Sequence, residues 1–136
     1  MSREKLQQEA DRWYRQSIDD LDAAQALIAA HKFAQACFYA QQATEKGLKA
    51  VWISLDSDPW GHFYTRLIRD LPQPAQSHFQ SLINLALALD KLYIPTRYPN
   101  ALVELTPAEA FTQGEAQTAL AAAQRLLHQV EQWLRA

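Results

Sequence analysis

Apolar residues recur every three or four positions along most of the chain, and this spacing places them on one face of an α-helix. The pattern predicts a first long helix over residues 3–30 and a second over residues 32–55. Further long helices are predicted over residues 74–92 and 113–135. In the second helix the repeating positions are Phe33, Ala36, Cys37, Ala40, Thr44, Gly47, Leu48 and Val51. Those in the middle of the helix are small and would let a neighbouring helix approach closely.

Capping residues and prolines indicate where the helices begin and end. Asp58 followed by Pro59 predicts the start of a short helix, which ends before Pro72. The Thr112–Glu115 segment has the spacing of a capping box and opens the last helix, and Thr106–Glu109 predicts one capped turn before it. The loop of about twenty residues after the third long helix is long for a compact domain, so it is either functional or packed down by its aromatic residues.

The composition agrees with the helical pattern. Ala, Leu and Gln supply 56 of the 136 residues, whereas Val, Ile and Thr supply 15. The first three are good helix formers, and the β-branched residues that favour strands are scarce. We therefore predict an all-α fold, an antiparallel up-and-down bundle of four to five helices in a single domain over residues 1–136.

Charge and cysteine content exclude several classes of protein. The chain has 13 basic and 15 acidic residues, a formal net charge of −2, which argues against strong non-specific binding to nucleic acid, although a local basic stripe would still allow it. A single cysteine, Cys37, forms no internal disulfide and supports no cysteine-based metal site. No signal peptide or membrane-spanning run is visible, so we expect a cytoplasmic protein without membrane contact.

The second predicted helix carries a group of polar side chains with binding potential. Tyr39, Gln42, Lys46 and Lys49 would line a polar groove, in which the lysines hold a phosphate or an acidic partner surface. Alternatively, Glu45 and Lys49 only form an ion pair across one helical turn. The sequence leaves both interpretations open.

The long loop holds the densest group of chemically useful residues. Arg97 lies between two prolines that stiffen its backbone, next to Tyr98 and near Asp90 and Tyr93. Such an arginine would clamp a phosphate or stack on a base. The alternative is that Arg97 pairs with Asp90 or Asp70 and pins the loop to the bundle.

Other candidates carry less specific signals. His62, next to a glycine, would act as a general acid–base residue or orient the short helix. The four histidines are too far apart in sequence to form a recognised ligand set, so we expect no metal and no cofactor. Four tryptophans either add to a dimer interface or fill the ends of the bundle: Trp13, Trp52, Trp60 and Trp133.

Three stretches together resemble the HEPN domain family. They are RWYRQSIDDLDAAQALIAAHKFAQACFYAQQATEKGLKAVWI over residues 12–53, the His-led segment WGHFYTRLIRDL, and DKLYIPTRYPN followed by an Ala-rich helix. The resemblance implies a helical bundle that forms a homodimer or higher homo-oligomer. It also implies a prokaryotic pairing with a small nucleotidyltransferase, often as a toxin–antitoxin couple, and contact with nucleotide or RNA.

Many proteins of this family are RNases that use an Arg and a His separated by four to six residues. No such pair occurs in this chain: two residues separate Arg125 from His128, and eight separate Arg69 from His78. The resemblance therefore favours a binding or regulatory module that partners a nucleotidyltransferase. A metal-independent RNase using Arg97 and His62 is a second hypothesis, and a homo-oligomeric scaffold without ligand is a third.

Overall fold

The computed structural model describes residues 2–59 and 64–136 and shows an all-α bundle with no strand among them. The long helices are α1 (Arg3–Ala29), α2 (Phe33–Ser54) and α7 (Gln113–Arg135). The shorter elements are α3 (Tyr64–Arg69), α4 (Ala75–Phe79), the 3₁₀-helix η1 (Gln80–Leu82), α5 (Ile83–Asp90), the 3₁₀-helix η2 (Pro99–Ala101) and α6 (Pro107–Ala110). The predicted all-α bundle is confirmed.

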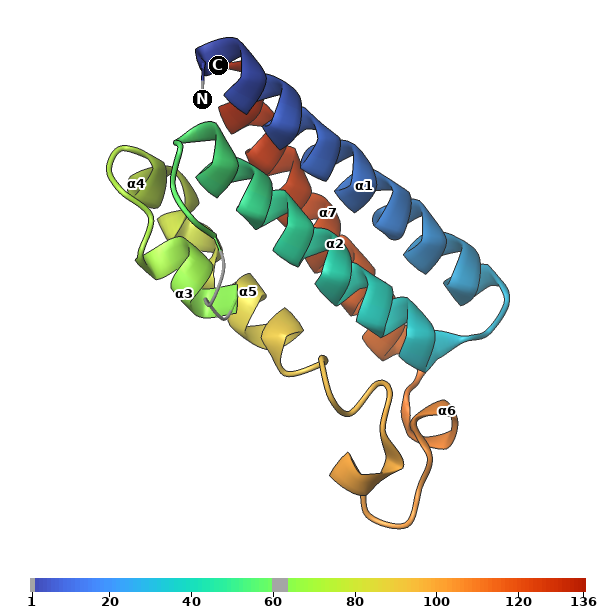
Figure 1. Cartoon of the computed structure of the whole chain (residues 1–136). Helices are drawn as coiled ribbons and strands as arrows, with labels where there is room; N and C mark the ends of the chain where they lie inside the picture. Colours follow the sequence, from blue (N-terminus) through green and yellow to red (C-terminus); the bar gives the residue numbers. More distant parts are fainter. Residues whose placement is uncertain (1, 60–63) are drawn as a thin grey trace.

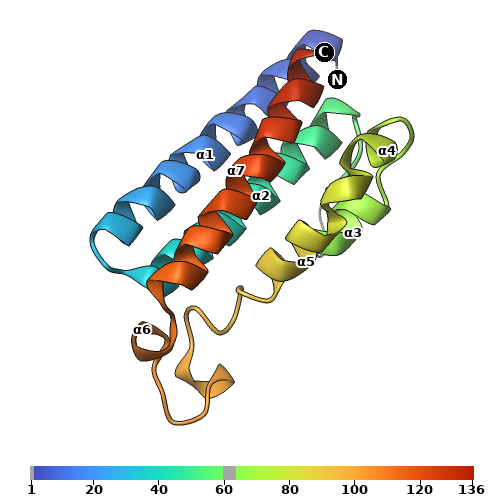
Figure 2. The same cartoon turned by 180° about the vertical axis from the view of Figure 1, so that it is seen from behind.

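The long helices lie side by side, and the short ones cover one flank (Figure 1). α1 and α2 run antiparallel along their whole lengths, and α7 packs against both. Seen from behind, α3 and α5 lie beside α2 and α7 on the flank away from α1 (Figure 2). Between α1 and α2 the chain turns sharply at His31, which has a positive φ of 60°, and the Lys32 N–H donates to the Leu27 carbonyl.

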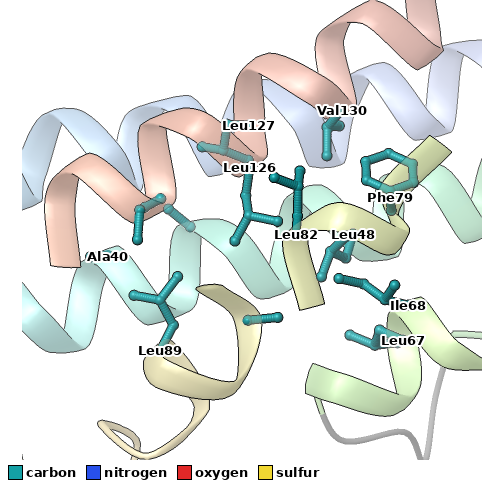
Figure 3. Packing of buried hydrophobic residues seen from close by; sticks show 14 of the residues in the cluster. Ala40, Leu48, Leu67, Ile68, Phe79, Leu82, Leu89, Leu126, Leu127 and Val130 are labelled. Carbon is teal, nitrogen blue, oxygen red and sulfur yellow. The ribbon is translucent and has the colours of Figure 1, made fainter. Parts of the chain in front are cut away.

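The hydrophobic core lies where α2, α7 and the short helices meet (Figure 3). Leu48 of α2 faces Leu126 and Val130 of α7, and Phe79 and Leu82 close this core from the side. Small residues line the contact between the long helices, and Ala36, Ala40 and Gly47 are buried as the spacing predicted. Ala24, Ala43 and Ala123 are buried as well. This close approach leaves the polar outer faces of α1 and α2 available at the surface.

Two predicted helices differ from the structure in detail. The helix predicted over residues 74–92 is interrupted at residues 80–82 by the 3₁₀-helix η1, and Phe79 and Leu82 are nevertheless both buried in the core. Asp58 and Pro59, the predicted start of the short helix, are irregular, and Pro59 is buried. Residues 60–63, which join them to α3, lie outside the described part of the chain.

Trp52 belongs to the core and not to a surface. Its indole N–H donates to the Leu67 carbonyl at 2.7 Å, which fastens α3 to α2. Trp13 and Trp133 are half-buried against the core, and Trp60 lies outside the described residues. For Trp52, the alternative that tryptophans fill the bundle is correct.

The two ends of the bundle differ in character. The first turn of α1 and the last turn of α7 lie together at one end, where Arg135 donates to Asp11 at 3.1 Å. The segment that joins α5 to α7, with η2 and α6, extends from the opposite end (Figure 1). None of the described helices is both long and apolar enough to cross a bilayer.

Candidate functional site

The long loop places Arg97 in a cluster of aromatic rings with Phe38, Tyr93 and Tyr98, here called the Arg97 cluster. The guanidinium carbon Cζ lies 4.3 Å from the centre of the Tyr93 ring and 4.8 Å from that of Tyr98. It also lies 4.7 Å from the Phe38 ring of α2. These cation–π contacts join the loop to the second helix, and each is worth roughly 0.5–1 kcal/mol at an exposed site.

The loop backbone holds Arg97 in a fixed position. The Arg97 Nε donates to the Tyr93 carbonyl at 3.1 Å, and the Arg97 and Tyr98 N–H groups both donate to the Ile94 carbonyl. The buried Thr96 hydroxyl donates to the Leu92 carbonyl. The alternative prediction was that an ion pair of Arg97 with Asp90 or Asp70 anchors the loop. The ring contacts and these main-chain hydrogen bonds anchor the loop instead. Asp70 pairs with Arg66 at 3.9 Å.

Most of the exposed large apolar side chains belong to the loop that carries Arg97. Among the described residues they are Tyr39 of α2 and five residues of the loop: Tyr93, Ile94, Tyr98, Val103 and Leu105. Val103 is 86% exposed. We call these six residues and Arg97 the loop surface.

Three of the polar residues predicted on α2 have partners on the long helices themselves. Lys46 points towards α1, where its Nζ lies 2.6 Å from a carboxylate oxygen of Asp20. Lys49 and Glu45 are half-buried and pair at 3.9 Å, which is the alternative that the sequence left open. Gln42 donates to the neighbouring Gln41 at 2.6 Å.

Lys46 lies instead at a pocket between α1 and α2, here called the α1/α2 pocket. It has a volume of about 550 Å³ and is lined by Glu9, Arg12, Trp13, Arg15, Gln16 and Lys46. Sequence reasoning missed the members from the first helix. Helical spacing does place Glu9, Arg12, Trp13 and Gln16 on one face of α1. Only the structure shows that this face lies beside Lys46 of α2.

The predicted site residues therefore separate into distinct groups. Tyr93, Arg97 and Tyr98 come together with Phe38, whereas Lys46 joins the α1/α2 pocket. Asp90 is the last residue of α5, at the start of the loop. His62 lies outside the described residues, so the hypothesis that it acts together with Arg97 stays a prediction.

The described chain offers neither a metal site nor a reactive thiol. No group of three or more His, Cys, Asp or Glu side chains in residues 2–59 and 64–136 has the geometry to hold a metal ion. Burial, together with the charge of Glu115, raises the pKa of the Cys37 thiol to about 12. Cys37 is thus the small core residue that the sequence predicted.

Solved structures of other proteins share this all-α bundle. The protein TT1696 from Thermus thermophilus superposes with a TM-score of 0.83 at 38% identity, covering 91% of this chain and 97% of that one. ST0689, described as an archaeal HEPN homologue, gives 0.75 at 29% identity, covering 92% and 97%. An HEPN domain protein from Thermotoga maritima gives 0.68 at 25% identity, covering 91% and 98%.

The family model of the HEPN domain matches residues 10–133. The chain therefore belongs to the HEPN domain family. It has no significant match among curated proteins.

Proposed function

We propose that this chain is the HEPN partner of a small nucleotidyltransferase and docks that enzyme through the loop surface. The observation that carries the proposal is the number of exposed apolar side chains on the loop that carries Arg97, two of which, Tyr93 and Tyr98, contact the guanidinium. The partner would carry out nucleotide transfer, and the pair would act in the cytoplasm as a toxin–antitoxin-like or nucleotide-handling unit.

The chemistry of the loop surface is typical of a protein interface. Tyrosine and arginine are enriched among the residues that contribute most to binding between proteins. Tyr93 and Tyr98 present rings with polar hydroxyls, and Val103 and Leu105 present apolar surface that water solvates poorly. A partner with an apolar groove flanked by a carboxylate would match both features.

The loop surface is also held in place before binding. Because Arg97 is stacked on three rings and bonded to the Tyr93 carbonyl, little side-chain freedom is lost when a partner carboxylate meets the guanidinium. This rigidity supports docking of a folded partner.

Affinity purification of the tagged chain from its native cells, followed by mass spectrometry, tests the proposal. We expect a small nucleotidyltransferase in near-stoichiometric amount. The Arg97→Ala, Tyr98→Ala double variant should recover at least tenfold less of it, and Arg69→Ala, which removes an exposed arginine of α3, should recover the normal amount.

Recovery of the chain alone, as a stable oligomer, would overturn the proposal. RNA cleavage by the purified protein that is lost in Arg97→Ala would instead support the RNase hypothesis. Equal recovery of the enzyme by the double variant and the wild type would show that docking uses another surface.

A further inference from the structure

We propose that a pocket between α3 and the segment from α4 to α5, here called the Arg69 pocket, binds a small hydroxylated carboxylic acid of the size of a sugar acid. The pocket has a volume of about 480 Å³, which lies in the range of small-ligand sites. Its lining among the described residues is mostly polar and consists of Arg69, Gln76, Gln80, Ser81, Ile83 and Asn84. None of these residues belongs to the loop surface, so the proposal does not depend on the docking of a partner.

The short helices that border the pocket lie together on one flank of the bundle (Figure 2). Arg69 is the last residue of α3. Gln76, Gln80 and Asn84 follow one another at intervals of four residues and line the same pocket, although η1 interrupts the helix between them. The pocket therefore receives a cation from one element and neutral amides from another.

Among the described residues, the guanidinium of Arg69 has no carboxylate partner. Arg66, one turn earlier in α3, pairs with Asp70 at 3.9 Å. Arg69 forms no ion pair within residues 2–59 and 64–136, and residues 1 and 60–63 contain neither Asp nor Glu. The guanidinium is therefore available for two parallel hydrogen bonds to the carboxylate of a ligand.

A chain of hydrogen bonds fixes the orientation of the Gln80 amide. The Ser77 main-chain N–H, which can only donate, donates to the Gln73 Oε1 at 3.3 Å. The Gln73 Nε2 then donates to the Gln76 Oε1 at 2.9 Å, and the Gln76 Nε2 donates to the Gln80 Oε1 at 2.6 Å. The chain ends on the Gln80 NH₂ group, so Gln80 offers the pocket N–H donors in addition to those of Arg69.

These groups favour a ligand with a single negative charge and several hydroxyl groups. One guanidinium balances one carboxylate, whereas a phosphate dianion would keep an unmatched charge. The described lining holds no carboxylate that would balance the ammonium of an amino acid. Ser81 and Asn84 both donate and accept hydrogen bonds, as the hydroxyl groups of a sugar acid do. An aromatic ligand is disfavoured, because the described lining offers no ring on which it would stack.

Titration of the isotope-labelled full chain, followed by NMR, tests the proposal with four probes: gluconate, sorbitol, acetate and glucose 6-phosphate. Gluconate should bind and shift the side-chain NH₂ signals of Gln80 and Asn84. Sorbitol has a neutral CH₂OH group in place of the gluconate carboxylate, and acetate lacks the hydroxyl groups, so each should bind at least tenfold more weakly. Glucose 6-phosphate should bind no more tightly than gluconate.

Variants then locate the site. Arg69→Gln should weaken gluconate binding at least tenfold, whereas Arg66→Gln removes the neighbouring exposed arginine, which has a carboxylate partner, and should bind gluconate like the wild type. Gln80→Glu replaces the donating NH₂ group with an acceptor of the same size and should also weaken binding at least tenfold. Gln117→Glu adds the same charge at an exposed position of α7 and should leave binding unchanged.

Several results would overturn the proposal. Gluconate binding that is absent, or unchanged in Arg69→Gln, would exclude the Arg69 pocket as the site. Sorbitol or acetate that binds as tightly as gluconate would show that the carboxylate or the hydroxyl groups are not recognised, and tighter binding of glucose 6-phosphate would identify the ligand as a phosphate ester. None of these results bears on partner docking by the loop surface, which the purification experiment tests separately.

Discussion

At the residue scale, Gly47 shows how closely the long helices approach. A Cβ atom built on Gly47 would lie 2.3 Å from the Leu127 Cδ2 of α7. Gly47→Ala therefore forces Leu127 to move within a filled core, which costs roughly 1–3 kcal/mol and outweighs the gain of about 1 kcal/mol in helix propensity. We expect a net loss of about 1 kcal/mol in the free energy of unfolding, measured by urea denaturation.

Gly114 provides the matched control for this substitution. A Cβ at Gly114 would meet only the Thr112 Oγ1, at 4.0 Å, so Gly114→Ala has room in the first turn of α7. This variant should be as stable as the wild type or more stable by up to about 1 kcal/mol. Equal stabilities of the two alanine variants would contradict the close contact at Gly47.

We expect Tyr14 to make the protein less stable at alkaline pH. Burial raises its pKa to about 12, helped by its hydrogen bond to Glu131 at 3.1 Å. Between pH 10 and pH 12 the unfolded tyrosine loses its proton while the folded one keeps it, so its contribution to stability is complete below pH 10 and falls as the pH rises. Because Glu131, the hydrogen-bond partner, is exposed to solvent, we expect a loss of about 1 kcal/mol.

Denaturation series at about pH 8 and about pH 11.5 measure this loss. Tyr14→Phe has no hydroxyl to titrate, so its free energy of unfolding should fall less over this interval than that of the wild type. Tyr98→Phe removes an exposed hydroxyl and should follow the wild type. If all three proteins lose the same stability, Tyr14 is not the titrating group.

Single residues were predictable where a local pattern decides their environment. The burial of Cys37 and Gly47 followed from helical spacing alone. The pairing of Lys46 with Asp20 did not, because it joins positions 26 residues apart in sequence. The contact of Arg97 with Phe38 is similarly non-local, so the sequence identified the arginine but not what holds it.

At the scale of elements, capping boxes determine where α6 and α7 begin. The Thr112 side chain accepts a hydrogen bond from the Glu115 N–H at 3.2 Å, and the Glu115 carboxylate accepts one from the Thr112 N–H at 3.1 Å. α6 begins with the same arrangement at Thr106 and Glu109. The short α6 has little else to fix its start, whereas α7 is also held by its buried face.

Removal of the α7 cap should lower stability by about 1 kcal/mol, because Thr112→Ala leaves the Glu115 N–H without its side-chain acceptor. Thermal unfolding followed by circular dichroism measures the change. Thr118→Ala replaces an exposed threonine within the same helix and should be neutral or slightly stabilising. A Thr112→Ala variant as stable as Thr118→Ala would show that packing alone holds the start of α7.

Element boundaries were predictable where the cap is local and failed where packing competes. Both capping boxes occur where the sequence placed them. The interruption at η1 was not predicted, because the core positions Phe79, Leu82, Ala86 and Leu89 keep helical spacing through it. The order of the helices was therefore predictable, but the 3₁₀ segment between α4 and α5 was not.

At the scale of the whole molecule, a second apolar surface supports the predicted self-association. A pocket of about 800 Å³ between α5 and α7 is lined mostly by leucine, alanine and threonine, with Glu115 and Arg125 as its charged residues. Exposed apolar surface of this kind favours burial against another chain. We predict a homodimer, with twice the 15.5 kDa mass of one chain in size-exclusion chromatography with light scattering.

Substitution on the rim of this pocket should dissociate the dimer. Ala121→Asp places a charge on the pocket wall and should yield a mass of 15.5 kDa. Ala26→Asp introduces the same change on an exposed position of α1 and should leave the dimer intact. A monomeric wild type, or a dimer that persists in Ala121→Asp, would contradict the prediction.

The architecture of the whole chain was the most predictable level. Helical spacing, composition and the resemblance of residues 12–53 to HEPN domains all indicated the bundle that the structure shows. The α1/α2 pocket was not predictable, because it depends on how two helices are rotated about their axes when they pack. A surface formed by two helices can be predicted only once the fold is known, whereas the fold itself follows from local periodicity.

The placement of the two chain ends determines how the protein can be tethered. The first turn of α1 and the last turn of α7 meet at one pole, and the loop surface lies at the other, beyond α2, whose 22 residues span about 33 Å. A reporter fused to either end, or a sensor chip that holds either end, would sit a full helix length from the loop surface. Immobilisation through either end would therefore leave the loop pole pointing into solution and open to an incoming protein.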